Sequence, residues 1–234
     1  MSHLFELVRP DVVIHCAAYT SVDRAELEVE RCKAVNIQGS INVAIESQKI
    51  GAKFVFISSD YVFDGEKQGA YETEDKTSPI NVYGLTKAIA EQEVCRINSK
   101  TFIVRTSWMF GEGKNFVNTM LELAKKQKEI AVVNDQIGSP TYAEDLAKFL
   151  YQLVKTEKYG VYHATNEGYC SWAKLAKKIF ELKKMNIQVQ EITSESYNSI
   201  ARRPHNSRLS KKSLVENGFA LFPDWEEALM NFLR

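Results

Sequence analysis

The sequence has no excess of charge of one sign and no long apolar run. Its 30 basic and 30 acidic side chains give a formal net charge of zero, so nothing in the composition indicates binding to nucleic acid or to a membrane surface. No apolar stretch approaches the roughly 18 residues that a membrane-spanning helix needs. The amino terminus does not have the pattern of a signal peptide. We therefore expect a cytoplasmic protein.

Cysteine is scarce as well. The chain has four cysteines, Cys16, Cys32, Cys95 and Cys170, and they form no Cys-x-x-Cys pair and no metal-ligand spacing. We expect reduced thiols and no metal site.

The chain also lacks a glycine-rich phosphate turn. None of its 11 glycines belongs to a Gly-x-Gly-x-x-Gly or Gly-x-x-Gly-x-x-Gly motif, which usually opens a dinucleotide-binding fold and binds the pyrophosphate. A buried strand is nevertheless predicted at residues 11–18, with only a short helix, residues 2–8, before it. The sequence predicts either a fragment of such a fold or a fold that does without this turn.

What the sequence does contain is an alternation of apolar strands and amphipathic helices. We predict strands at residues 11–18, 53–59, 101–106, 129–134, 161–164 and 188–192. Helices are predicted at residues 36–49, 81–96 and 116–126, from a capping box at Thr141 and Glu144 to about residue 156, after Ser171, and after Asp224. This alternation is typical of an α/β fold with a Rossmann-like, doubly wound parallel sheet.

The pattern loosens after Gly111, which suggests two interleaved domains. We expect residues 1–110 and about 141–165 to form a Rossmann-like dinucleotide-binding domain without its first βαβ unit. Residues from about 111 to 140 and from 166 to 234 would then form a small α/β substrate-binding domain.

The apolar strand at residues 53–57 stops abruptly at Ser58, Ser59 and Asp60. Ligands of open parallel sheets bind just beyond the carboxyl ends of the strands. Tyr83 and Lys87 follow, four residues apart on one face of the next predicted helix. An ammonium near a phenol lowers the pKa of the phenol and suits it to general acid catalysis, and a hydroxyl can hydrogen-bond a carbonyl oxygen as it becomes negative. By itself this spacing also fits a surface pair and an ordinary strand-to-loop junction.

Residues 58–65, Ser-Ser-Asp-Tyr-Val-Phe-Asp-Gly, followed by Tyr-Gly-Leu-Thr-Lys at residues 83–87, resemble the extended short-chain dehydrogenase/reductase superfamily. Within it, the chain is similar to the family of dTDP-4-dehydrorhamnose reductases. This closer resemblance runs from Arg9 to Trp225 and rests on residues 17–26, 105–108, 134–141 and 201–209. It implies the reduction of the C4 ketone of dTDP-4-dehydro-L-rhamnose to dTDP-L-rhamnose with NADPH or NADH.

The resemblance also implies a catalytic set made of Tyr83, Lys87 and Ser59. Tyr83 would donate the proton to the C4 carbonyl oxygen. Lys87 would hold the nicotinamide ribose and tune Tyr83. Ser59 stands where the family usually has threonine, and either residue supplies the hydroxyl. Asn36 matches an asparagine of the superfamily that is either structural or part of a proton relay.

Binding residues can be carried over in the same way. Those implied for the cofactor are Ala17, Ala18, Tyr19, Thr20, Ser58, Tyr83 and Lys87. Those implied for the nucleotide sugar are Ser59, Asp60, Tyr83, Trp108, Arg203 and Asn206, with Arg203 facing the diphosphate unless it belongs to an ordinary basic surface loop. One departure is His15-Cys16, where the family usually has Asn-Ala.

Two alternatives remain open. His15-Cys16 and residues 57–65 fit equally well a non-catalytic regulatory subunit of the methionine adenosyltransferase β type, which shares this scaffold. The chain would otherwise be an inactive reductase fragment. Because these 234 residues hold no pyrophosphate turn, we expect them alone to bind NADPH or NADH weakly and to have negligible activity. The open edge of the strand at Val12 would also favour self-association, such as a homodimer.

Overall fold

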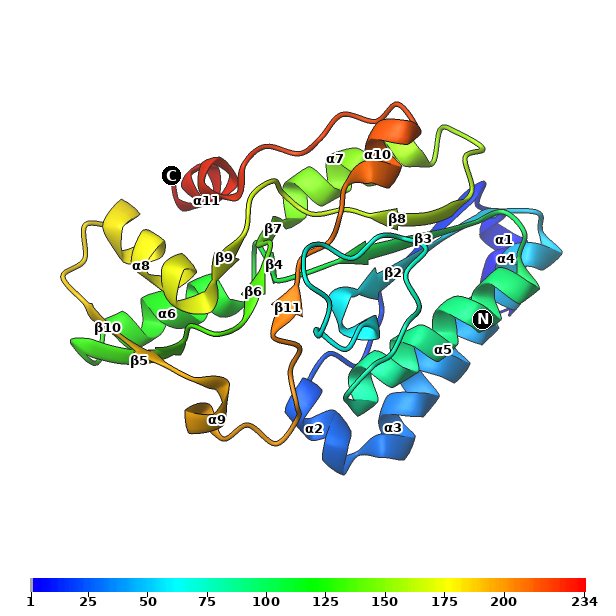
Figure 1. The fold of residues 1–234 in the computed structure, drawn as a ribbon. Helices are drawn as coiled ribbons and strands as arrows, with labels where there is room; N and C mark the ends of the chain where they lie inside the picture. The colour runs from blue at the N-terminus through cyan, green and yellow to red at the C-terminus, as the bar shows by residue number, and fades with distance from the viewer. Residues whose placement is uncertain (1) are drawn as a thin grey trace.

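A four-stranded parallel sheet with the order β1-β2-β3-β8 forms the centre of the molecule (Figure 1). The computed structural model describes residues 2–234. The strands are β1 (Val12–His15), β2 (Lys53–Ser59), β3 (Thr101–Thr106) and β8 (Gly160–His163). Because all four run in the same direction, their carboxyl ends meet at one edge of the sheet. The predicted Rossmann-like α/β fold is confirmed.

Helices cover both faces of this sheet, with α5 on one side and α7 and α10 on the other (Figure 1). Alternate residues of the strands face the two helical layers. Phe54, Phe56 and Ile103 pack against α4 and α5, whereas Val55, Phe102 and Val104 pack against α7. The helices of this part are α1 (Ser2–Val8), α2 (Val22–Leu27), α3 (Val29–Lys33), η1 (Ala34–Gly39, a π-helix), α4 (Ser40–Lys49), η2 (Asp60–Val62, a 3-10 turn), α5 (Val82–Ile97), α7 (Ala143–Leu153) and α10 (Lys212–Glu216).

A second group of elements lies beyond the carboxyl ends of the sheet and has its own hydrophobic core (Figure 1). A parallel pair of strands, β5 and β10, packs there against α6 and α8. Short strands link this group to the sheet. The elements are β4 (Met109–Phe110), α6 (Phe116–Ala124), β5 (Glu129–Val133), β6 (Ile137–Gly138), β7 (Thr141–Tyr142), β9 (Cys170–Ser171), α8 (Trp172–Leu182), β10 (Gln188–Ile192), α9 (Ser194–Tyr197), β11 (Asn206–Ser207) and α11 (Trp225–Leu233).

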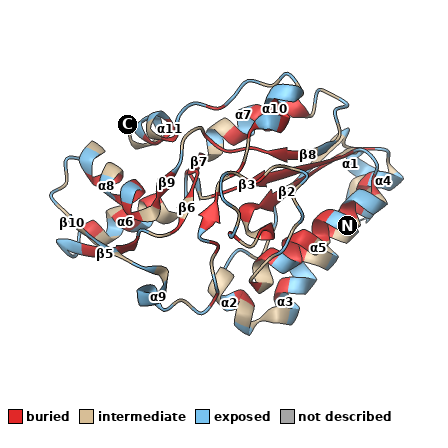
Figure 2. Cartoon of the chain, viewed as in Figure 1, coloured by how far each residue is buried: buried red, intermediate tan, exposed pale blue. Residues whose placement is uncertain are grey.

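Figure 2 shows that burial is concentrated on the strands of the sheet and on the inward faces of the surrounding helices. The division into two domains stays a prediction. The packing adds one detail, because Leu214 of α10 and Phe222 join the core formed by α7 and the sheet. Although they come late in the sequence, these residues therefore pack with the Rossmann-like part.

Several predicted elements differ from those observed. The predicted strand at residues 11–18 is shorter, since β1 ends at His15, and the predicted helix at residues 36–49 begins as a π-helix. The capping box is wrong. Tyr142 is the N-cap of α7 and makes no side-chain cap bond, because Thr141 is paired with Met109 in β7. Sheet pairing overrides the local signal there.

Within residues 2–234, no helix combines the length and the apolar character that crossing a bilayer requires. All four cysteines are free thiols. The same residues contain no cluster of three or more His, Cys, Asp or Glu side chains placed to hold a metal ion.

Candidate active site

The end of β2 brings hydroxyls and a carboxylate to one edge of the sheet. Ser59, its last residue, caps the following turn, because its Oγ accepts a hydrogen bond from the Tyr61 amide at 3.1 Å. The same hydroxyl donates to Asp60 Oδ1 at 2.9 Å. Thr106, the last residue of β3, is the parallel partner of Ser59. The polar residues predicted at this strand end are therefore held in fixed positions.

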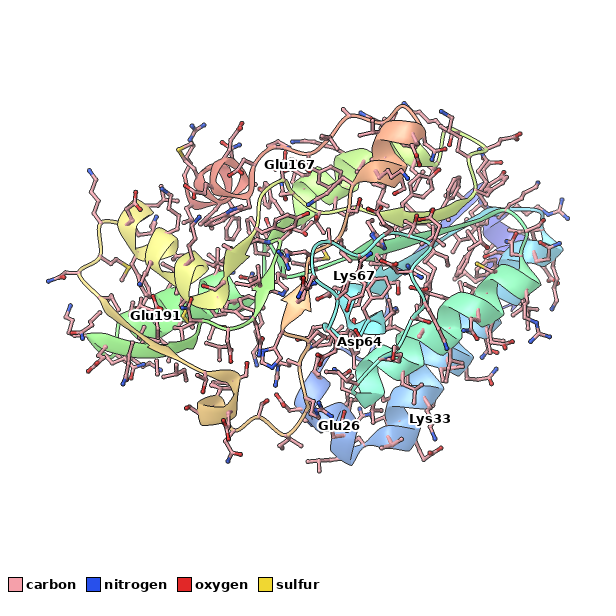
Figure 3. All side chains as sticks on the ribbon, viewed as in Figure 1. Glu26, Lys33, Asp64, Lys67, Glu167 and Glu191 are labelled. Carbon is pink, nitrogen blue, oxygen red and sulfur yellow. The ribbon has the colours of Figure 1, made fainter. Side chains whose placement is uncertain are left out.

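The first turn of α5, which carries Tyr83, is held by two neighbours. Asn81 is the N-cap, and its side-chain oxygen accepts from the Gly84 amide at 2.7 Å. The Val82 amide donates to the Glu26 carboxylate at 2.8 Å; Glu26 lies on α2 beside the start of α5 (Figure 3). These bonds satisfy amides that a helix start otherwise leaves unpaired.

Glycine at position 84 lets α5 approach the turn after β2. A Cβ atom there would lie 2.0 Å from the Tyr61 carbonyl oxygen, which no side chain allows. Because of this close approach, the rings of Tyr61 and Tyr83 meet edge to face, with centroids 5.9 Å apart. The Tyr-Gly pair of the sequence motif is thus a packing requirement that brings Tyr83 to the end of β2.

The pKa of Tyr83 is higher than that of a free tyrosine. Burial is the main cause and the negative charge of Asp60 adds to it, while a hydrogen bond with Ser59 partly offsets both. The sequence predicted the opposite direction, a pKa lowered by Lys87. Here burial and the carboxylate of Asp60 raise the pKa instead, so Tyr83 keeps its proton throughout the neutral range, as a proton donor must.

Lys87 is buried one turn further along α5, with 2% of its surface exposed. Its ammonium lies 3.9 Å from the centroid of the Phe56 ring. Burial lowers the pKa of Lys87 to about 8, and the charge of Glu91 offsets part of that shift. The ammonium has no hydrogen-bond partner among residues 2–234. A buried charge that no hydrogen bond compensates is costly, which favours a ligand-binding role over a structural one.

Asp60 is equally buried, with 3% of its surface exposed. Burial raises the pKa of its carboxyl group to about 6, although the hydroxyls of Ser207 and Ser59 act in the other direction. Within the described residues, Asp60 Oδ2 has no hydrogen-bond partner. This oxygen is the kind of acceptor that a sugar hydroxyl can satisfy.

Asp60→Asn should change how stability depends on pH. A folded-state pKa of about 6, against an ordinary 3.8, means that the charged carboxylate destabilises the fold. The cost is absent below about pH 3.8 and complete above about pH 6, where it amounts to roughly 3 kcal/mol. Denaturant unfolding of both proteins at pH 4 and pH 7 should show the variant gaining stability relative to wild type as pH rises. The exposed Asp11→Asn serves as control, and a difference that does not vary with pH would contradict the prediction.

The residues implied for the cofactor follow the carboxyl end of β1. Ala17 and Thr20 are exposed, whereas Ala18 and Tyr19 are half-buried. The backbone there is held by Asn36, whose side chain accepts from the Tyr19 amide at 2.7 Å. Asn36 also donates to Thr86 of α5 at 2.9 Å. The π-helix thus places Asn36 between this loop and the helix that carries Tyr83 and Lys87.

Not every side chain in that set points into the site. The Tyr19 hydroxyl donates to Glu28 at 2.9 Å, so only the backbone and ring edge of Tyr19 remain for a ligand. Ser58 Oγ, by contrast, is buried and has no hydrogen-bond partner in the described part of the chain. Its hydroxyl is free to serve a bound group.

The residues implied for the substrate are more dispersed. Trp108 has a left-handed backbone, with φ of 47°, and stacks on Trp172 at a centroid distance of 3.6 Å. Arg203 forms an ion pair with Asp23 at 2.6 Å. Asn206 donates to the carbonyls of Lys67 and Gly69, both at 2.7 Å, on the loop that runs past Asp64 and Lys67 (Figure 3). Contact between the Asn206 side chain and substrate would have to replace one of these bonds.

Two cavities adjoin these residues, and Arg203 lines both. The smaller, of about 330 Å³, has mostly apolar walls that include Tyr61, Phe116, Met120, Trp172 and Tyr197. The larger, of about 520 Å³, is polar and is lined by Asp64, Asp135, Ser194, Arg202 and His205, among others. Sequence reasoning missed the aromatic residues of the smaller cavity. They come from unrelated segments with no common spacing, so no sequence signal identified them.

Comparisons with known proteins agree with this geometry. The family described as RmlD substrate binding domain matches residues 1–234. The dTDP-4-dehydrorhamnose reductase of Aggregatibacter actinomycetemcomitans is 41% identical, over 97% of this chain and 82% of its own length. The spore coat polysaccharide biosynthesis protein SpsK of Bacillus subtilis (strain 168) is 40% identical, over 99% of this chain and 82% of its own.

A solved structure is similar over the same range. The dTDP-4-dehydrorhamnose reductase from Bacillus anthracis str. Ames, crystallised in complex with NADP, superimposes with a TM-score of 0.98 at 45% identity. The alignment covers 99% of this chain and 83% of that one.

Proposed function

The chain belongs to the family of RmlD substrate binding domains, and from this premise we infer that it reduces dTDP-4-dehydrorhamnose, as the names of two of its relatives, both dTDP-4-dehydrorhamnose reductases, state for those proteins. It is an oxidoreductase that uses NADPH or NADH. The reaction converts the C4 ketone of the sugar into a hydroxyl group. The observation that carries the assignment is the convergence of Ser59, Tyr83 and Lys87 at the carboxyl end of β2.

We propose that Tyr83 donates its phenolic proton to the carbonyl oxygen. Its raised pKa means that it enters the reaction protonated. The Ser59 hydroxyl, which donates its one O–H to Asp60 at 2.9 Å, would turn that proton to the same oxygen as negative charge develops on it. The Lys87 ammonium, on the same face of α5 one turn away, favours the tyrosinate that remains.

The residues present fit the nicotinamide half of a cofactor, which when bound supplies a hydride to the carbonyl carbon. Ser58 carries a buried hydroxyl without a partner in the described part of the chain, and Lys87 carries an ammonium on a side chain that is 2% exposed. A ribose or a carboxamide can hydrogen-bond such groups. Ala17 and Ala18 bring little side chain to the loop after β1, so a ligand can approach the backbone there. The binding of this half by Lys87, Ser58 and residues 17–20 is part of the proposal.

For the substrate, we propose that the nucleotide occupies the smaller cavity. Its aromatic and aliphatic walls suit a nucleobase and deoxyribose, and Arg203 lines the same cavity and suits a diphosphate. The group built on β5, α6 and α8 would then be the substrate-binding domain, while the Rossmann-like sheet carries the catalytic residues. Asp60 and Trp108 would contact the sugar. A regulatory role without catalysis would leave the costly burial of Lys87 and Asp60 unexplained.

Two measurements test this function. The full-length protein that contains these residues should oxidise NADPH or NADH, followed at 340 nm, when dTDP-4-dehydro-L-rhamnose is added. It should not do so with dTDP-glucose, which has no C4 ketone. Residues 1–234 alone should bind dTDP, since the proposed nucleotide cavity lies within them. Absence of both turnover and dTDP binding would refute the assignment.

A further inference from the structure

The segment from Ile200 to Pro204 contributes residues to both cavities. Ala201 and Arg202 line the larger cavity, and Arg203 lines both. This segment has no regular secondary structure, so its position depends on the bonds made by its side chains and backbone. The main bonds come from α2 and from the start of α5.

Asp23, in the first turn of α2, binds this segment at several atoms. Its Oδ2 accepts from Arg203 Nη2 at 2.6 Å, and its Oδ1 accepts from Arg203 Nη1 at 3.2 Å. Oδ1 also accepts from the Ala201 amide at 3.0 Å. The Asp23 carboxylate therefore binds both the Arg203 guanidinium and the backbone two residues before it, although Asp23 and Arg203 are 180 residues apart in the sequence.

The bonds to Asp23 leave some N–H donors of the Arg203 guanidinium for a ligand. Arginine has five N–H donors in a rigid plane. Asp23 takes one from each Nη, and the Ala201 carbonyl accepts from Nη1 as well, at 3.2 Å. The Nε–H is used by neither of these acceptors, and the other neighbour of the guanidinium is the Tyr61 hydroxyl, which a ligand can replace. With 19% of its side chain exposed, Arg203 is partly desolvated, so a carboxylate on one edge compensates its burial while the other edge can meet an anion.

The same elements hold the catalytic helix. Asn81, the N-cap of α5, donates to the Arg202 carbonyl at 2.9 Å. Glu26 of α2 accepts from the Val82 amide, one residue before Tyr83. Residues 200–204 and the first turn of α5 are thus both bonded to α2. These bonds fix the position of the guanidinium relative to Tyr83.

We propose that Asp23 is a positioning residue that fixes Arg203 in the wall of the smaller cavity. In this way it sets the preference of the enzyme for nucleoside diphosphate sugars. Asp23 does not touch the substrate. The inference rests on the proposed function in one respect, the binding of a nucleotide in that cavity. Beyond that function, we infer that Asp23 orients Arg203 and that its effect on affinity depends on the diphosphate of the ligand.

The test compares dTDP with thymidine as ligands of the wild-type protein and of Asp23→Asn, by calorimetry. Asparagine keeps an oxygen for the Ala201 amide but loses the charge that orients the guanidinium. We expect at least about a tenfold loss of dTDP affinity, the size of one charged hydrogen bond, with thymidine affinity unchanged. In turnover, KM for the nucleotide sugar should rise while kcat stays near its wild-type value.

A double variant identifies the route of the effect. If Asp23 acts through Arg203, then Asp23→Asn combined with Arg203→Met should bind dTDP no more weakly than Arg203→Met alone. Asp23→Glu, which keeps the charge, should recover part of the affinity. Equal losses for dTDP and thymidine, or additive losses in the double variant, would overturn the proposal. If wild-type protein fails to bind dTDP, the proposed function fails instead.

Discussion

Tyr83→Phe should lower kcat by about 10²- to 10⁴-fold, the usual contribution of a positioned general acid. The phenylalanine ring can keep the edge-to-face contact with Tyr61, so the change removes the hydroxyl and little else. Binding of dTDP and of the cofactor should therefore stay close to wild type. Turnover at saturating substrate, combined with calorimetry of both ligands, measures the two effects separately.

Tyr151→Phe is a matched control, because Tyr151 has 64% of its surface exposed on α7, away from the sheet edge that carries the site. It should have wild-type kinetics. Wild-type kcat in Tyr83→Phe would remove Tyr83 from the mechanism. A large loss of ligand binding in that variant would show that the hydroxyl serves binding instead of proton transfer.

Lys87→Met should make the protein more stable to unfolding but less active. With a pKa of about 8 against an ordinary 10.5, the buried ammonium costs roughly 3 kcal/mol of folding free energy at neutral pH. The cost is complete below about pH 8 and disappears as pH rises to about 10.5. At pH 7 the variant should therefore unfold at higher denaturant concentration than wild type, while its cofactor affinity and turnover fall.

The pH–rate profile gives a second readout of Lys87. Wild-type activity should decline as pH rises through about 8, where the ammonium loses its proton. In Lys87→Met the residual activity should decline only at higher pH, because the group that titrates near 8 is gone. Lys114→Met, an exposed lysine on another loop, should leave both curves unchanged. An unaltered profile with loss of stability would make Lys87 a structural residue.

Much of the proposed catalytic site can be predicted from the sequence because it depends on local order. The strand at residues 53–59 is apolar from Phe54 to Ile57, so it is buried, and the polar residues at its end must lie at the carboxyl edge of a parallel sheet. Tyr83 and Lys87 are one helical turn apart whatever surrounds them. Gly84 then lets the helix reach that edge. These three features can be inferred from local geometry and from the general topology of the fold.

The charge states of the same residues depended on the tertiary structure. The sequence indicated that Lys87 lowers the pKa of Tyr83, but in the folded chain desolvation and the carboxylate of Asp60 raise it. How strongly a group is desolvated depends on every segment that packs around it, and no spacing rule supplies that information.

The sequence alone thus determined the fold class, since that follows from periodicity, and its short motifs indicated the catalytic side chains that we propose. Only the tertiary structure decided which residues line the cavity that we propose for the nucleotide, and that Arg203 is bound by Asp23. Phe116, Trp172 and Tyr197 come together from three separate segments, and Asp23 meets Arg203 from the other end of the chain. Such contacts arise from the packing of whole elements, which local sequence patterns do not encode.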